Sequence, residues 1–165
     1  MGLYIIVLNG LYLYTGKIGY LVGEKPDYLI TLLVTWLGNL LGTFAGAKVL
    51  LCTRVSYLSE AAAAASQAKL NQSVWSALIL SFFCGILMFA AVDGFRERQN
   101  PLILFLCVSV FILCGFEHCI ANMFYFSLGS AWSLKALGYL MIMTLGNSLG
   151  GMLIPAVKKS LLRFG

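Results

Sequence analysis

Charged side chains are scarce in this chain, making up 10% of its 165 residues, whereas a soluble domain carries roughly 25%. Hydrophobic residues make up 61%, which is more apolar surface than one soluble core of this size could bury. The composition therefore excludes an ordinary soluble domain and predicts an integral membrane protein. The net charge of +5 does not indicate a nucleic-acid partner, because the basic residues are scattered and several flank hydrophobic segments.

Residues that carry enzyme chemistry are also scarce. The chain has one histidine, and its five cysteines form no Cys-x-x-Cys pair. No metal cluster, no nucleophile with a paired base and no phosphate-binding loop is evident, so we expect no metal, no cofactor and no enzymatic activity. The cysteines are interpreted as small buried hydrophobic residues.

Hydrophobic segments of membrane-spanning length are, by contrast, abundant. A helix needs about 20 apolar residues to cross the hydrocarbon core, and residues 28–52, 73–92, 102–126 and 136–157 meet this length. A fifth segment, residues 3–22, is interrupted by glycines and by Lys17. This indicates a helix that breaks at membrane depth, where irregular backbone must be surrounded by protein or a cavity. We predict an all-α polytopic membrane protein with about five transmembrane helices in one domain, residues 1–165.

The connections and their charges predict an orientation. The long connection at residues 53–72 contains an alanine run at 61–65, which predicts a short surface helix. One side of the membrane collects Lys25, Arg96, Arg98, Lys158, Lys159 and Arg163. The other collects Arg54, Lys69 and Lys135, with Lys48 near its helix end. The larger first group favours a cytoplasmic C-terminus, in a multi-pass protein of the cell (inner or plasma) membrane.

One ionisable pair lies inside an apolar segment. Glu117 and His118 are flanked by uncharged residues at 101–114 and 119–134. Such groups are costly at membrane depth, and they usually face a pore or a partner helix. Neighbours are about 100° apart around a helix, so the two side chains cannot face the same lumen. From the residues alone, the simpler interpretation of His118 is an interhelical histidine with satisfied hydrogen bonds.

A short repeat follows each interrupted segment. The letters WLGNLLG at residues 36–42 reappear as TLGNSLG at residues 144–150. The first copy follows a break that we place at residues 15–17, and the second follows one at residues 115–118. With the orientation above, the copies run in opposite directions, which is typical of transport folds whose broken helices meet at the midplane. Close helix packing by the glycines alone remains the alternative interpretation.

These motifs resemble a known family. The letters GFEHCIANMF at residues 115–124 are similar to the GFEHxxANM-aromatic signature of the formate/nitrite transporter family. The letters LYTG at residues 13–16 resemble the loop in its broken second helix, and the Gly-Asn pairs resemble its paired motifs. Lys69 lies where family members keep a vestibule lysine. The resemblance covers residues 3–163 and implies an aquaporin-like architecture, with two broken helices in an inverted repeat, assembled as a homopentamer.

Two departures from the family pattern stand out. Family members have a further transmembrane helix before the region that this chain resembles, so we expect the chain to be truncated at its N-terminus relative to the family. A fragment, a misassigned start and a degenerate member all remain open. Helix four of the family usually carries a Cys-Asn pair, where this chain has Cys84-Gly85. If that asparagine braces the broken helices, its loss loosens the pore.

The resemblance implies a channel or proton-coupled carrier in the lipid bilayer for small monovalent weak-acid anions: formate, nitrite, or relatives such as hydrosulfide and lactate. It implies that His118 assists by donating a proton, with Thr15 as its hydrogen-bonding neighbour, since the reference pKa of imidazole, about 6.5, lies in the physiological range. It also implies a constriction of Leu13, Tyr14 and Phe111, for which plain packing is the alternative. The alternative function is a non-conducting truncated subunit, or a structural remnant of such a channel.

The remaining candidate residues surround the breaks. We expect the Glu117 carboxylate to act as a brace that accepts hydrogen bonds from freed backbone donors, the alternative being a buried partner for a lysine such as Lys17. Three asparagines are expected to brace the breaks as well: Asn39, Asn122 and Asn147. Lys69 is expected to attract anions at the outer vestibule. Lys17 either does so at the inner one or extends its ammonium toward the membrane interface.

Overall fold

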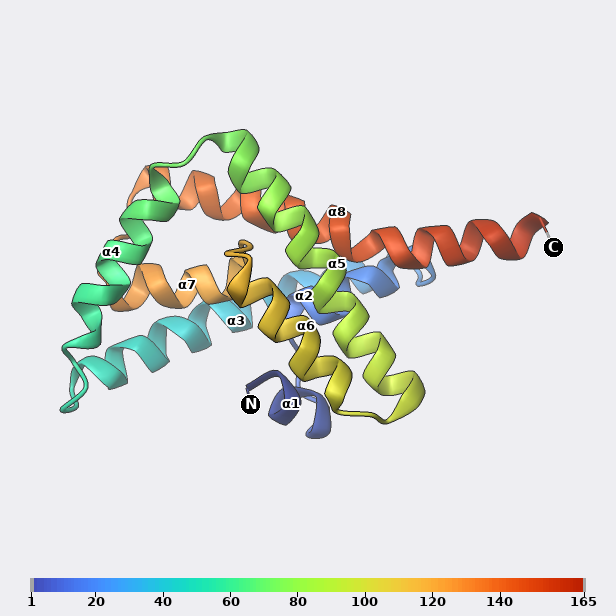
Figure 1. Ribbon diagram of the computed structural model, residues 1–165, viewed down its shortest axis with the longest axis horizontal. Coiled ribbons are helices and arrows are strands. Elements are labelled where there is room, and N and C mark those ends of the chain that lie inside the picture. The colour runs from blue at the N-terminus through green and yellow to red at the C-terminus, as the bar shows by residue number, and fades with distance from the viewer. Residues whose placement is uncertain (1, 165) are drawn as a thin grey trace.

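The computed structural model describes the backbone of residues 2–164 and the side chains of residues 2–162, so the side chain of Arg163, which we counted toward the orientation, lies outside the described part. The described chain is a bundle of helices (Figure 1). In order they are α1 (Gly2–Leu8), α2 (Tyr14–Lys17), the 3₁₀ helix η1 (Ile18–Val22), α3 (Tyr28–Leu51), α4 (Leu58–Leu70), α5 (Val74–Arg98), α6 (Leu102–Leu113), α7 (Cys119–Leu128) and α8 (Leu134–Phe164).

Three of these helices, α3, α5 and α8, are long and apolar enough to cross a membrane. They coincide with three of the predicted segments, and α3 and α8 run in opposite directions (Figure 1). The predicted segment 102–126 consists of two shorter apolar helices, α6 and α7, separated by residues 114–118. Residues 3–22 are divided in the same way, into α1 and the pair α2 and η1. The all-α fold with two broken segments is therefore confirmed.

The two breaks are built by the same backbone motif. Gly10 and Gly115 have φ of 63° and 65°, a left-handed conformation that favours glycine. The residue after each glycine donates its N–H to a carbonyl five residues back, over 2.9 Å at Leu11 and 3.0 Å at Phe116. This bond is the glycine-based C-cap that ends many helices. The first break thus lies at residues 9–13, and our placement of it at residues 15–17 was wrong, because residues 14–17 form α2.

The helix that follows each break begins from an extended residue. Leu13 precedes α2 with φ −115° and ψ 123°, and His118 precedes α7 with φ −104° and ψ 114°. Each residue stands at the same distance along the chain from its glycine, Gly10 or Gly115. Leu13 and His118 therefore occupy equivalent places in the two halves of the repeat.

Helices α5 and α8 cross in close contact through glycines. A Cβ added at Gly85 would overlap the backbone of Asn147, and a Cβ at Gly150 would overlap the carbonyl of Phe82. Gly85, at the position where the sequence departs from the Cys-Asn pair, allows α5 and α8 to approach each other. In the first copy of the repeat, a Cβ at Gly38 would meet no atom of the described residues within 4 Å. The two copies thus differ in packing.

Helix α4 is longer and less exposed than we predicted from the alanine run at 61–65. Gly129, after the end of α7, lies directly against the backbone of Ala62 and Ala63. Ala62 also forms a small buried cluster with Ala47 of α3 and Leu128 of α7. The predicted surface helix is therefore present, and one of its faces packs into the molecule and carries its C-terminal end toward the second break.

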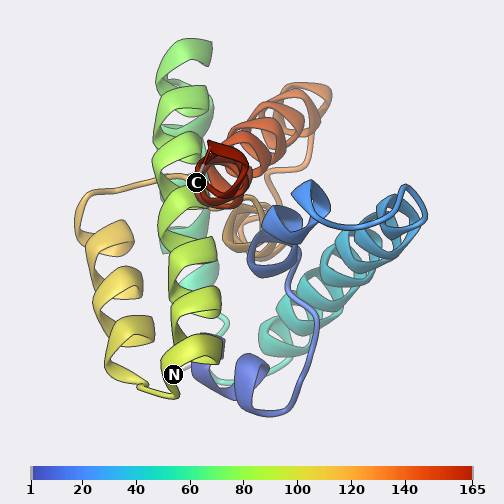
Figure 2. The ribbon, with the colours of Figure 1, turned by 90° about the vertical axis from the view of Figure 1, so that its right-hand side faces the viewer.

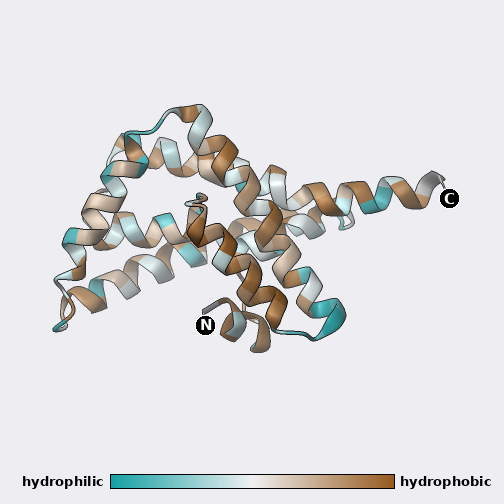
Figure 3. Cartoon of the chain, in the orientation of Figure 1, coloured by the Kyte–Doolittle hydropathy of each residue, from teal (hydrophilic) through white to brown (hydrophobic). Residues whose placement is uncertain are grey.

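The ends of α5, η1 and α8 lie at one end of the molecule. The Lys158 ammonium donates to carboxylates of Asp93 and Glu97, over 3.1 and 3.0 Å, and Lys159 donates to the carbonyl of Val22 over 2.7 Å. The turn after α5 is hydrophilic and α6 beside it is hydrophobic (Figure 3). Figure 2 looks onto this end of the bundle, with α5 and α6 side by side and α3 on the far side of α8. Arg96 and Arg98 in the last turn of α5 thus share one end of the molecule with Lys158 and Lys159 of α8.

Candidate pore site

An asparagine of the repeat holds the first break. The Asn39 side chain accepts a hydrogen bond from the Tyr14 N–H over 3.0 Å and donates one to the Tyr12 carbonyl, also over 3.0 Å. These two backbone groups lie on either side of Leu13. The side chain of Asn39 thereby supplies partners that the interrupted helix cannot, and it holds Leu13 in its extended conformation.

The second asparagine holds the second break in the same way. Asn147 Oδ1 accepts from the Cys119 N–H over 2.8 Å, and its Nδ2 donates to the Glu117 carbonyl over 2.9 Å. These groups flank His118, as those bound by Asn39 flank Leu13. Asn147 Nδ2 also donates to the Ser81 carbonyl of α5 over 2.7 Å, and the residue is fully buried. The two copies of the repeat therefore match in their sequence and also in the hydrogen bonds that hold the breaks.

His118 joins the two halves of the repeat. Its Nδ1 accepts a hydrogen bond from the Ala121 N–H over 3.1 Å and caps α7. Its Nε2 lies 2.9 Å from the hydroxyl of Thr15 on α2, and both residues are buried. A neutral imidazole whose Nδ1 accepts carries its proton on Nε2, so Nε2–H donates to Thr15 Oγ1 in this arrangement.

His118 also lines a hollow of about 410 Å³ between α1, α3, α6 and α7. Leu13 and Phe111 line the same hollow, and the ring centroid of Phe111 is 5.8 Å from that of His118. Tyr14, which we predicted to join their constriction, lines a separate hollow beside Trp36. Its hydroxyl lies 2.9 Å from that of Ser148. The predicted constriction is thus brought together at Leu13 and Phe111 and not at Tyr14, because successive residues at the start of α2 point in different directions.

Glu117 is a buried carboxylate whose side chain is 5% exposed. It accepts hydrogen bonds from Lys69 Nζ over 2.7 Å, from Gln72 Nε2 over 2.9 Å and from Asn122 Nδ2 over 2.7 Å. In the described part of the chain its donors are therefore side chains, whereas we expected freed backbone N–H groups. The alternative, a buried partner for a lysine, is confirmed, and the lysine is Lys69, not the Lys17 that we named as an example.

Gln72, in the turn between α4 and α5, is a residue that reasoning from the sequence missed. Its side-chain oxygen accepts from the Ser76 hydroxyl over 2.8 Å, and its carbonyl accepts from the hydroxyl of Tyr139. These contacts orient its amide toward Glu117. A glutamine in a turn between helices has no distinctive spacing, so the sequence contained no signal for this role.

The two lysines that we assigned to the vestibules have different surroundings. The Lys69 ammonium is paired with Glu117 and lies 5.6 Å from the ring centroid of Tyr125. Lys17, at the end of α2, places its ammonium 4.3 Å from the ring centroid of Tyr12. It shares a small hollow with Arg96 of α5. Glu117 therefore balances the charge of Lys69, and α2 holds Lys17 beside a second cation.

Replacing Lys69 with methionine is expected to destabilise the protein by about 3 kcal/mol, because it leaves a buried carboxylate without its cation while keeping the apolar stem. Adding Glu117→Gln should restore part of this loss, since the remaining group is then neutral. The measurement is the Tm of detergent-solubilised protein. Lys48→Met is the matched control, because Lys48 is exposed on α3. Equal instability of the single and double variants would contradict an ionic interaction.

Among the side chains of residues 2–162, no three of His, Cys, Asp and Glu come together in a group that could hold a metal ion. Cys84 and Cys119 are buried, as interpreted, and Cys107 is half-buried. Cys52 and Cys114 are exposed, so for these two the interpretation as buried residues was wrong.

A family model described as formate/nitrite transporter matches residues 1–160. The chain belongs to the formate/nitrite transporter family. It is 27% identical over 146 residues to the formate channel FocA of Haemophilus influenzae, covering 78% of this chain and 51% of that protein. It is 28% identical over 171 residues to the nitrite transporter NirC of Escherichia coli, covering 92% of this chain and 64% of that protein. The chain thus spans between half and two thirds of the length of these relatives.

Solved structures of the formate/nitrite transporter family share the fold. A pentameric formate channel with formate bound superposes with a TM-score of 0.82 at 25% identity, over 99% of this chain and 80% of that one. An ion channel of the same family superposes with a TM-score of 0.81 at 24% identity, over 97% and 72% of the two chains, and supports the fold alone. The two broken segments and the long apolar helices are therefore those of this membrane transport family.

Proposed function

We propose that this chain forms a transmembrane channel for small monovalent weak-acid anions of the formate and nitrite class. The observation that carries the proposal is the pair of equivalent breaks, which hold Leu13 and His118 at corresponding places beside one apolar hollow. Membership of the formate/nitrite transporter family supports it. So do the names of a relative and a solved structure, a formate channel and a pentameric formate channel with formate bound.

In the proposed mechanism, His118 lowers the barrier by supplying a proton. An anion that enters a narrow apolar passage loses most of its hydration, which is costly unless a charge or a hydrogen bond replaces the water. None of the residues that line the described hollow is a lysine or an arginine. His118 first takes up a proton from water and, while bonded to the Thr15 hydroxyl, transfers it to the anion. The neutral acid then crosses and releases the proton on the other side, and His118 is protonated again for the next anion.

The remaining assignments are part of the same proposal. Leu13 and Phe111 narrow the passage and exclude hydrated ions by dewetting. Lys17 attracts anions on one side. Lys69, whose charge is balanced by Glu117, attracts anions less than an unpaired cation would. Residues 1–165 act as one channel domain in a homopentamer of the cell membrane. The C-terminus is cytoplasmic, an orientation supported by Arg96 and Arg98 at the end of α5 and by Lys158 and Lys159 of α8.

Uptake into proteoliposomes tests the proposal. The purified chain is reconstituted, and its correct insertion is checked by protease protection of an epitope at the C-terminus. We expect saturable uptake of labelled formate and of nitrite above that of empty liposomes, with sucrose excluded. Uptake at the rate of empty liposomes by correctly inserted protein would contradict the proposal, and it would favour the alternative of a non-conducting subunit.

A further inference from the structure

The hollow beside His118 contains few polar side-chain atoms. Its lining is apolar except for Thr43, His118 and Tyr125. The Thr43 hydroxyl donates to the Asn39 carbonyl of its own helix over 2.8 Å. Both ring nitrogens of His118 are engaged, one by the Ala121 N–H and the other by Thr15. Two of the three polar groups are thus already occupied before any anion enters.

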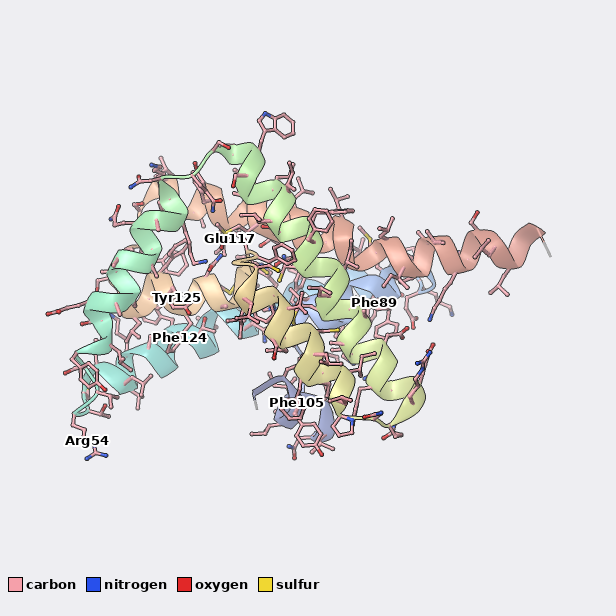
Figure 4. All side chains as sticks on the ribbon, viewed as in Figure 1. Arg54, Phe89, Phe105, Glu117, Phe124 and Tyr125 are labelled. Carbon is pink, nitrogen blue, oxygen red and sulfur yellow. The ribbon has the colours of Figure 1, made fainter. Side chains whose placement is uncertain are left out.

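The hydroxyl of Tyr125 is the third polar group, and it bonds to none of the residues that the structure describes. Tyr125 is 39% exposed and lies on α7, as does the neighbouring Phe124 (Figure 4). It follows His118 by two helical turns, about 10 Å along the axis, so both residues face the hollow. An arriving anion can therefore meet this hydroxyl at a distance from the histidine.

The surroundings of Tyr125 favour a hydrogen bond to an anion. Its phenol combines an apolar ring with a polar donor, the combination by which a largely apolar site orients a small ligand. The Lys69 ammonium, paired with Glu117, lies 5.6 Å from the centroid of this ring and holds the ring in place. A hydrogen bond from a neutral donor to an anion is stronger than one between neutral groups.

We propose that Tyr125 is a specificity-determining residue that donates a hydrogen bond from its hydroxyl to an oxyanion in the hollow before the anion reaches His118. This inference rests on the proposed function. It names the ligand class more narrowly, as monovalent anions with oxygen acceptors, carboxylate or nitrite. Sulfur is a weak hydrogen-bond acceptor, so hydrosulfide gains little from the same donor.

The experiment compares Tyr125→Phe with the wild type in proteoliposomes. Phenylalanine keeps the ring beside Lys69 and removes the hydroxyl alone. We expect the half-saturating concentration of formate to rise about tenfold, the effect of losing one hydrogen bond to a charged group. The maximal rate should stay unchanged within about twofold, because His118 and Thr15 are intact. The half-saturating concentration of hydrosulfide should change little. Tyr57→Phe is the matched control, since Tyr57 is 67% exposed and does not line the hollow.

Two results would overturn the inference while leaving the proposed function intact. One is an unchanged half-saturating concentration of formate in Tyr125→Phe. The other is an equal rise for formate and hydrosulfide, which would indicate altered access and no selective hydrogen bond. A wild-type protein that moves neither anion would overturn the proposed function and this inference with it. If the wild type transports formate and Tyr125→Phe has the same half-saturating concentration, only the role of Tyr125 is rejected.

Discussion

Formate uptake is expected to fall about 100-fold when His118 is replaced by asparagine, the loss associated with removing a positioned proton donor. The structure makes asparagine more informative than alanine. His118 caps α7 through Nδ1, and asparagine is among the best N-cap residues. His118→Asn therefore keeps the cap and removes the titratable ring, whereas His118→Ala removes both. Uptake is measured in proteoliposomes, with assembly checked by size-exclusion chromatography.

The pH dependence and a variant of the neighbouring residue sharpen this prediction. After subtraction of empty-liposome flux, wild-type uptake should be greater at about pH 5 than at about pH 8, because each crossing needs a proton. The small residual uptake of His118→Asn should lose this dependence. Thr15→Val keeps the shape but leaves His118 Nε2 without its partner, and we expect a loss of about tenfold. Full uptake with an unchanged pH profile in assembled His118→Asn would refute the proton-donor mechanism.

Replacing Asn147 with alanine is expected to produce the largest loss of stability, about 4 kcal/mol. The substitution leaves the buried Cys119 N–H without its acceptor, and it removes the donor to the carbonyls of Glu117 and Ser81. An orphaned buried backbone group costs about 1–3 kcal/mol, and the cavity left behind adds to it. The measurement is the Tm of detergent-solubilised protein, together with the amount of folded protein recovered.

Asn39→Ala is the matched control within the same repeat. Asn39 binds the equivalent groups of the first break, Tyr12 and Tyr14, but it is only half-buried, so water can replace part of what it supplies. We expect Asn39→Ala to cost about 1 kcal/mol. Equal losses of stability for the two alanine variants would show that burial does not decide how much each asparagine contributes. A negligible loss for Asn147→Ala would refute its role in holding the second break.

The two breaks are equivalent in their backbone, yet a histidine is found at only one of them. Leu13 and His118 have the same backbone environment, each held by an asparagine of the repeat. The symmetry of the fold therefore provides two positions beside one hollow. The sequence places an apolar leucine in the first and an ionisable histidine in the second. In the proposed function, exclusion of hydrated ions and supply of a proton are assigned to symmetry-related residues.

Local properties of the sequence were enough to predict the long helices, the membrane class and the family. The length of an apolar run and the presence of a glycine-interrupted centre depend only on neighbouring residues, and the signature at residues 115–124 is contiguous. The first break was misplaced by a few residues because Gly10 and Gly16 are both glycines within an apolar run. Only the structure distinguishes the one with positive φ, Gly10, from the one inside a helix.

Which side chains meet was decided by the tertiary structure. Glu117 pairs with Lys69, 48 residues earlier in the chain, because α4 packs against the end of α7 at Gly129. Neither residue's own segment encodes that contact. Tyr14 turns away from the hollow, whereas Tyr125 faces it. The sequence by itself determined that this is a helical membrane protein with two broken segments, since the length of an apolar segment and its interruption by glycine depend only on neighbouring residues. The partners of its buried polar groups depend on how separate helices cross, and only the folded structure shows that.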